Sequence, residues 1–327
     1  MWLDKIFKKA VSVPSLAMDT EVFILLDDSS VSFCHYPKSK TELKLMSADL
    51  LRKAVEYVQA NHKKAAVIYP EYPIPSSHAA ILSAFQHKKI MSIKQFDTDA
   101  NVIVFEDWQE LSQIPSWLKH RYIWKTTTLE LVNNWQRLPF ESPVRIDIVV
   151  SDIADLTDED LKQYHTILAN MADRMTEVMG QQQQFHTNLL TDRIFLTEMS
   201  NCGAGEKHIT IAPDGKFYIC PAFYDGQMGD IGSLETGIEI KNKQLYSIEF
   251  APICQHCDAY QCKRCVWLNK KLTYEVNTPS HQQCVMAHLE RNASRQLLLQ
   301  VQDAGKLKDK EIPEIHYIDP FDVRYEW

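Results

Sequence analysis

Seven of the eight cysteines lie within one stretch of the chain, and thiolates at that density bind metal or carry redox chemistry. The seven are Cys202, Cys220, Cys254, Cys257, Cys262, Cys265 and Cys284. An odd number pairs badly as disulfides, and disulfides are rare in the reducing cytoplasm where we expect this chain to reside. The first residues support that location, because they carry mixed charge and lack the apolar core of a secretory signal. Metal binding is therefore the favoured interpretation.

The spacing of the cysteines favours iron–sulfur clusters over zinc. Two Cys-x2-Cys pairs, Cys254–Cys257 and Cys262–Cys265, are separated by only four residues. Zinc ribbons use similar pairs but usually place them about 15–20 residues apart. The crowding here is closer to ferredoxin-type runs, in which one cysteine of a dense group can serve a second cluster. The alternative is a pair of structural zinc sites that fold a small domain.

A β-hairpin is expected to bring two of the other cysteines together. Residues 208–212 and 216–220 have strand character, and Pro213-Asp-Gly215 between them is typical of a tight turn. The hairpin would end by presenting Cys220. Cys202, just before its first strand, would then lie near Cys220.

The complete pattern resembles the seven-cysteine SPASM domain, the auxiliary-cluster module of radical SAM enzymes that modify peptides and small proteins. That pattern is Cys-x12-Gly-x4-Cys, then Cys-x2-Cys-x4-Cys-x2-Cys, then a lone cysteine. The segments Cys202-Gly-Ala-Gly205, Tyr218-Ile-Cys-Pro221 and Met228-Gly-Asp-Ile-Gly232 are also similar to the family. The resemblance covers roughly residues 200–290, and the gaps between the last four cysteines are one residue shorter than in many members.

This resemblance implies up to two [4Fe–4S] clusters. The first would be held by Cys254, Cys257, Cys262 and Cys284. The second would be held by Cys202, Cys220 and Cys265. Full members add an eighth cysteine just upstream of the first, which this chain lacks. The second cluster would then have an open position for a substrate, or a ligand such as Glu198, His208, a water or a substrate thiol; incomplete occupancy is the other outcome.

Strands that alternate with helices precede the cysteines and indicate an α/β domain with a mainly parallel sheet. The expected strands are 22–26, 65–69, 90–93, 102–105 and 144–150, and the expected helices are 47–60, 77–85, 128–136 and 158–180. The fold class is α/β: a partial (β/α) barrel resembling a radical SAM core, followed by a small cysteine-rich, SPASM-like α+β domain. The polar residues 181–184 mark the boundary. The predicted domains are 1–185, 186–300 and a C-terminal tail, 301–327.

The loop after the first strand departs from the radical SAM pattern. The family holds its reactive cluster there with Cys-x3-Cys-x2-Cys, and the corresponding positions here are Asp27, Val31 and Cys34. One thiolate cannot hold that cluster, so we expect a degenerate site with no SAM cluster and no SAM cleavage. Tyr69-Pro-Glu-Tyr-Pro73 likewise replaces the glycine-rich segment expected after the second strand. Cys34 is then interpreted as a buried free thiol that behaves as a small hydrophobe.

Several polar residues near these positions have an ordinary interpretation as well as a functional one. Asp27-Asp28 follow a strand at the edge where barrels place function, although a capped loop is the favoured interpretation. The histidines His35, His256 and His281 are expected to be solvated rather than ligands or proton carriers. Lys263-Arg264 would either offset the negative charge of a cluster or serve as surface cations. No catalytic residue is assigned.

Composition limits the partners. A net charge of −8 argues against a nucleic-acid partner, and the longest apolar runs are too short to cross a membrane. The chain also resembles the CXXX-repeat peptide maturase type, which is associated with short cysteine-repeat precursor peptides. The hypothesis is an iron–sulfur protein that binds a precursor peptide or relays electrons beside a radical SAM enzyme. The alternatives are a SAM-independent peptide-modifying enzyme with an open cluster site, and a zinc-stabilised binding module; whether the chain is itself an enzyme stays open.

Overall fold

The computed structural model of the 327-residue chain describes residues 20–38, 40, 43–111, 120–179, 185–196, 198–199 and 201–306. The strands are β1 Glu21–Leu25, β2 Lys64–Ile68, β3 Lys88–Ser92, β4 Val102–Phe105, β5 Arg121–Thr126, β6 Arg145–Val150, β7 His208–Ile211, β8 Phe217–Tyr218, β9 Gly232–Ser233 and β10 Gly237–Ile238. The helices are α1 Ala48–Ala60, α2 Ser76–Ser83, α3 Trp108–Leu111, α4 Thr128–Asn134, α5 Asp158–Val178, α6 Asp192–Phe195, α7 Pro221–Asp225, α8 Val266–Thr273 and α9 His281–Asp303.

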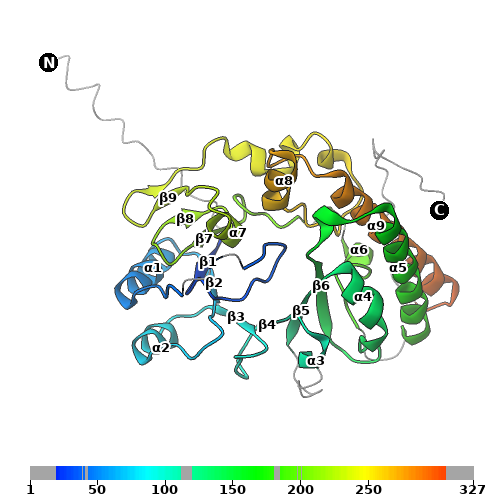
Figure 1. Cartoon of the computed structure of the whole chain (residues 1–327), viewed down its shortest axis with the longest axis horizontal. Coiled ribbons are helices and arrows are strands. Elements are labelled where there is room, and N and C mark those ends of the chain that lie inside the picture. The colour runs from blue at the N-terminus through cyan, green and yellow to red at the C-terminus, as the bar shows by residue number, and fades with distance from the viewer. Residues whose placement is uncertain are drawn as a thin grey trace, which may run out of the picture.

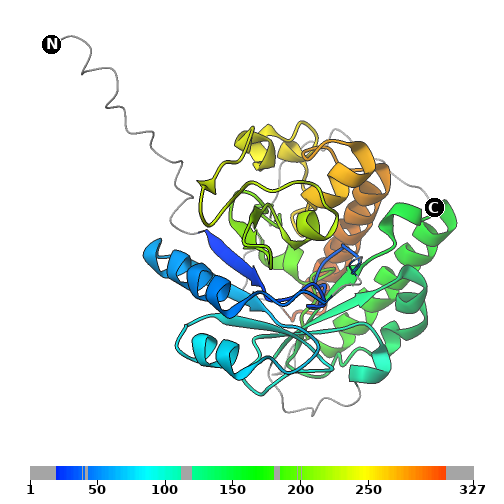
Figure 2. The same cartoon turned by 60° about the vertical axis from the view of Figure 1, so that its left-hand side comes forward.

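An eight-stranded sheet organises the molecule, with strand order β6-β5-β4-β3-β2-β1-β7-β8. Strands β1 to β7 run parallel to their neighbours, and β8 returns antiparallel to β7. Figures 1 and 2 show a curved sheet with α1, α2, α4 and α5 on its outside. Within the described residues the sheet is open, because β6 and β8 are its edges. The predicted α/β class with a mainly parallel sheet is confirmed.

Sequence and structure agree on the first six elements, which are β1 to β4 with α1 and α2. Val22 and Ile24 of β1 are completely buried, as expected for a parallel strand covered on both faces. Ser47 caps α1 by accepting a hydrogen bond from the Leu50 amide. Thr157 and Asp160 form a capping box at the start of α5, whose first turn is acidic. Strand β5 was not predicted.

The cysteine-rich part shares the sheet of the N-terminal part. Strand β7 pairs with β1 through Val22 and Ile209, so strands on both sides of the expected boundary belong to one sheet. The boundary residues 181–184 and most of the expected tail lie outside the described residues. The hairpin of β7 and β8 is confirmed, and Gly215 in its turn has a φ of +80°, which favours glycine.

Helix α9 joins the two parts a second time. It packs along α5, as Figure 1 shows, and begins with a capping box formed by Ser280 and Gln283. The Tyr164 hydroxyl of α5 donates to the Glu290 carboxylate of α9 at 2.7 Å. Among the described residues, no helix combines the length and apolar character needed to cross a membrane.

His208 makes the β1–β7 contact sensitive to pH. Its ring lies 4.9 Å from that of Phe23, and burial lowers the pKa of His208 from 6.5 to about 4. A base whose pKa falls on folding stabilises the native chain above its unfolded pKa, and this contribution is lost as the pH falls from about 6.5 toward 4. We expect the free energy of unfolding to drop less between about pH 7 and pH 5 in His208→Gln than in the wild type. Urea denaturation at both pH values under reducing conditions measures this drop.

The exposed His62→Gln variant is the matched control and should keep the wild-type pH dependence. An identical drop in His208→Gln and the wild type would show that His208 is not protonated differently in the two states.

Candidate metal centre

The loop after β1 is held by its own aspartates. Asp27 is completely buried, and its carboxylate accepts hydrogen bonds from the Tyr72 hydroxyl at 2.9 Å and the Ser29 amide at 2.6 Å. The Asp28 carboxylate accepts from the Tyr224 hydroxyl of α7 at 2.7 Å. The favoured interpretation of a capped loop therefore agrees with these contacts, and Val31 is buried with only 3% exposure.

The next residues fold back across the sheet. The Phe33 ring lies 5.5 Å from that of Phe23 in the middle of β1. The Lys125 ammonium of β5 donates to the Ser32 hydroxyl at 2.8 Å and to the Tyr36 carbonyl at 2.7 Å. Figure 1 shows this loop, in dark blue, reaching from β1 toward β6. Cys34 is thereby fixed over the sheet.

His35 differs from its expected solvated state. Its Nδ1 lies 3.0 Å from the Val150 carbonyl oxygen at the end of β6, where it acts as the donor. Burial lowers the pKa of His35 below its usual value. The histidine therefore anchors the loop, and a neutral ring is the form that this site favours.

One group of thiols forms where the cysteine loops meet the β1 loop. The Cys202 amide donates to the Lys263 carbonyl at 2.8 Å, and the Cys202 sulfur lies 3.9 Å from the Arg264 carbonyl oxygen. Burial raises the pKa of the Cys265 thiol well above its usual range, and the thiols of Cys202 and Cys34 raise it further. Burial, followed by Cys34, Cys265 and Cys202, does the same for Cys220. Cys34, Cys202 and Cys265 therefore lie within electrostatic range of Cys220.

Close packing of backbone makes this group compact. Gly205 has a φ of +82°, and a Cβ at this position would lie 2.9 Å from the Tyr246 ring and 3.2 Å from the Ile219 side chain. Tyr246 in turn accepts a hydrogen bond from Arg264 through its carbonyl, and Ile219 precedes Cys220. Glycine is therefore needed for the segment after Cys202 to approach both neighbours.

A second group of thiols lies beside α9. Cys254 and Cys257 belong to one tight turn, with the Cys257 amide donating to the Cys254 carbonyl at 3.2 Å. Burial raises the pKa of Cys262 to about 12, and the thiols of Cys254 and Cys284 contribute to the rise. The Cys257 sulfur lies 3.6 Å from His288 Nε2, a neighbour that was not predicted. No disulfide joins the eight cysteines in the described part of the chain.

Two cavities adjoin the thiols. One of about 90 Å³ is bordered by His35, Cys262, Cys265 and Glu290. Burial raises the pKa of Glu290 to about 7. The other, of about 220 Å³, is bordered by Cys284 together with His281 and His288. His256 and His281 are exposed, which agrees with their expected solvation.

The ligands suggested for an open position are placed differently. Glu198 is exposed, whereas His208 packs against Phe23. Neither environment indicates a ligand, and the structure instead brings Cys34 to the three thiols. The interpretation of Cys34 as a buried free thiol that behaves as a small hydrophobe did not include these neighbours, and its side chain is only partly buried.

The two metal alternatives make different demands on the arrangement. Within the described residues, no group of three or more cysteine, histidine or acidic side chains is arranged to hold a metal ion. Zinc requires four ligands that meet at about 2.0–2.3 Å from one point, so the zinc alternative gains no support. An iron–sulfur cluster needs sulfurs that are farther apart, because iron and sulfide lie between them.

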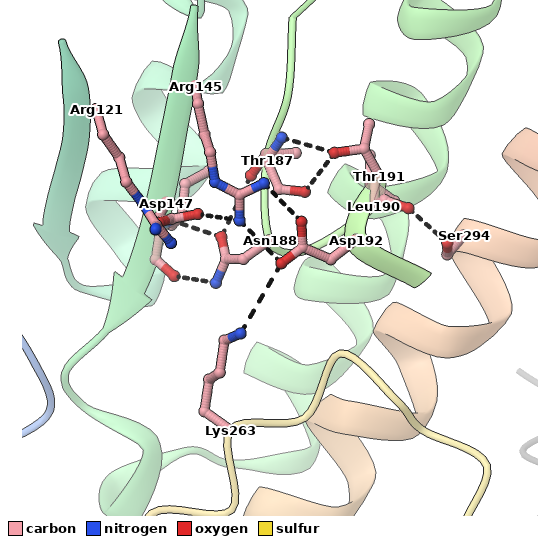
Figure 3. Close-up of polar contacts among 11 residues, drawn as sticks. Arg121, Arg145, Asp147, Thr187, Asn188, Leu190, Thr191, Asp192, Lys263 and Ser294 are labelled. Atoms are coloured by element: carbon pink, nitrogen blue, oxygen red, sulfur yellow. Dashed lines mark hydrogen bonds and ion pairs between the residues drawn. The ribbon is translucent and has the colours of Figure 1, made fainter. Parts of the chain in front are cut away.

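A buried arginine lies beside the cysteines and has donors without a partner among the described residues. Arg264 is only 3% exposed, and its Nε and Nη1 have no hydrogen-bond partner within the described part of the chain. A thiolate-ligated cluster is negative and could satisfy such donors. Lys263 is partly exposed and pairs with Asp192 at 3.9 Å, and Asp192 also binds Arg145 (Figure 3). Of the two cations considered from sequence, Arg264 is the buried one.

The loop between the cysteine pairs is anchored to α9 by charge. The Asp258 carboxylate accepts from Arg291 at 2.5 Å and from Arg295 at 2.8 Å, and the side chains of Asp258 and Arg291 are about 5% and 4% exposed. This pair fixes the residue that follows Cys257.

Comparison with solved structures supports the fold. No family model matches the chain, and no curated protein matches it. A solved structure of histidine-tagged anSMEcpe with bound AdoMet is 12% identical in sequence, with a TM-score of 0.58. The match covers 87% of this chain and 99% of the anSMEcpe chain. The chain therefore has a radical SAM-like α/β fold. A structure of Streptococcus suis SuiB bound to S-adenosylmethionine is 11% identical, with a TM-score of 0.46; the match covers 83% of this chain and 75% of the SuiB chain.

The buried pair predicts a specific loss of stability. Asp258→Ala would leave Arg291 buried without its carboxylate, so we expect the free energy of unfolding to fall by about 3–5 kcal/mol. Urea denaturation of the reduced protein measures it. The matched control is Asp49→Ala, which removes an exposed carboxylate paired with Arg52 and should change stability little. Equal losses in the two variants would contradict the anchoring role of Asp258.

Proposed function

We propose that this chain is an iron–sulfur protein of peptide maturation. It would bind a ribosomally synthesised precursor peptide, of the cysteine-repeat type that the family resemblance suggests, and act as a substrate-binding or electron-relay accessory to a radical SAM enzyme. The observation that supports the proposal is the grouping of cysteines that form no disulfide into two sets beside a radical SAM-like sheet.

The site for a SAM-binding cluster supports an accessory role. Asp27 and Val31 occupy two of its three expected cysteine positions, and the Asp27 carboxylate is engaged by Tyr72 and Ser29. A carboxylate fixed in this way is a structural cap. We therefore propose that the chain does not cleave SAM, although anSMEcpe was solved with AdoMet bound.

The chain's own residues would tune the clusters. When bound, an iron–sulfur cluster supplies one-electron transfer. Cys254, Cys257, Cys262 and Cys284 would hold the cluster beside α9, and Cys202, Cys220 and Cys265 would hold the other. Arg264 and Lys125 would offset negative charge, since both cations are buried near the thiols. Cys220 and Cys254 are buried, and a low local dielectric there would favour the less charged oxidation state of a cluster.

A second candidate function rests on the cavity of about 90 Å³ beside Cys265. A peptide side chain placed there would lie beside the three-cysteine site, whose open position fits a SAM-independent modifying enzyme. Incubation of the loaded protein alone with a cysteine-repeat peptide separates the two functions. A mass shift on the peptide would favour the enzyme, and an unchanged peptide that still binds would favour the accessory.

The proposed function predicts clusters without SAM chemistry. We expect the anaerobically reconstituted protein to contain iron and sulfide in equal amounts and to produce no 5′-deoxyadenosine from SAM and dithionite, because the β1 loop offers one thiolate where three are needed. Metal analysis and chromatography of the reaction measure both quantities. Reductive SAM cleavage would overturn the accessory role, and zinc without sulfide would establish the zinc-stabilised binding module.

A further inference from the structure

We propose that Cys34 is the fourth thiolate of the site formed by Cys202, Cys220 and Cys265. The inference rests on the proposed iron–sulfur function and assigns a ligand that neither the cysteine spacing nor the comparisons provide. A cysteine of the degenerate β1 loop would then complete a cluster that belongs to the C-terminal part.

The position of Cys34 is fixed by its neighbours on both sides. Phe33 packs on Phe23 of β1, and His35 binds the Val150 carbonyl at the end of β6. The Lys125 ammonium holds the carbonyl of Tyr36. These contacts come from three different strands, so the loop has little freedom to carry the Cys34 thiol elsewhere.

The other three thiols are delivered to the same place by backbone contacts. Strand β7 lies directly beside β1, and its hairpin leads to Cys220. The amide of Cys202 binds the loop between Cys262 and Cys265 through the Lys263 carbonyl. His35, the residue next to Cys34, and Cys265 both border one cavity of about 90 Å³.

The thiols lie within electrostatic reach of one another. An ionised Cys34 would disfavour ionisation of Cys220 and of Cys265, and Cys202 acts on Cys34 in the same way. Four thiols within this range are enough to supply the four cysteine ligands of one iron–sulfur cluster.

Buried cations on two sides match an anionic cluster. Arg264 borders the cavity beside Cys265 with Nε and Nη1 unsatisfied among the described residues. Lys125 is 8% exposed, and its nearest carboxylate is that of Glu106 at 3.9 Å, which is mostly exposed. Each thiolate ligand adds one negative charge to the cluster. The positive charges of Arg264 and Lys125 would compensate for the charge of a fourth thiolate. The site would then be a closed cage, and a substrate would have no open iron to bind.

The closing experiment compares Cys34→Ser with Val31→Ala. Serine keeps the size of the side chain and removes the sulfur, whereas Val31→Ala perturbs packing in the same loop without removing a thiol. Each protein is reconstituted anaerobically, iron and sulfide are counted, and the oxidised samples are examined by electron paramagnetic resonance. Circular dichroism of the metal-free proteins checks folding.

We expect the wild type and Val31→Ala to bind two four-iron clusters. Cys34→Ser should either lose about half of the iron or show the signal of a three-iron cluster, because three thiolates retain such a cluster less completely. Wild-type iron and spectrum in Cys34→Ser would overturn the inference. Absence of iron and sulfide from the wild type would overturn the proposed function instead.

If Cys34→Ser does not fold, thiol labelling of the wild type tests whether Cys34 is a cluster ligand. The loaded wild type is exposed briefly to an alkylating reagent, and Cys34 should react as slowly as Cys220 and faster after iron is chelated. Reaction of Cys34 at equal rates before and after chelation would contradict its assignment as a ligand.

Discussion

The parallel pairing of β1 with β7 determines where the cysteines can meet. It places the loop that follows β1 beside the hairpin that leads to Cys220. The pairing joins a radical SAM-like sheet to the cysteine-rich segment, and α9 reinforces the junction by packing on α5. Both thiol groups therefore depend on long-range contacts, although most of their cysteines are close in sequence.

Burial of the thiols has an energetic consequence for metal binding. Burial raises the pKa of Cys220 and of Cys265 well above the usual range of a thiol, which favours their protonated form. A cluster must displace those protons, and its binding is correspondingly linked to pH. Buried cations such as Arg264 lower the electrostatic cost of the thiolates. The fold thus buries the positively charged Arg264 where an anionic group would bind.

Local signals in the sequence located much of this structure. The apolar run at 22–26 predicted β1, and the turn at Gly215 predicted the β7–β8 hairpin, because burial and turn chemistry are encoded by adjacent residues. Strand β5 was missed because Arg121 and Lys125 interrupt its apolar pattern. The placement of Cys34 beside Cys202 could not be predicted, since it depends on contacts from β5 and β6 with the folded-back loop. The same holds for His288 beside Cys257.

We propose that the two groups of cysteines hold iron and sulfide. Native mass spectrometry of protein purified without oxygen tests it most directly, because the added mass identifies the bound group. We expect a species heavier than the bare chain by two four-iron, four-sulfide clusters. Acid treatment should remove that added mass. A chain with no added mass, or with the mass of zinc ions alone, would contradict it.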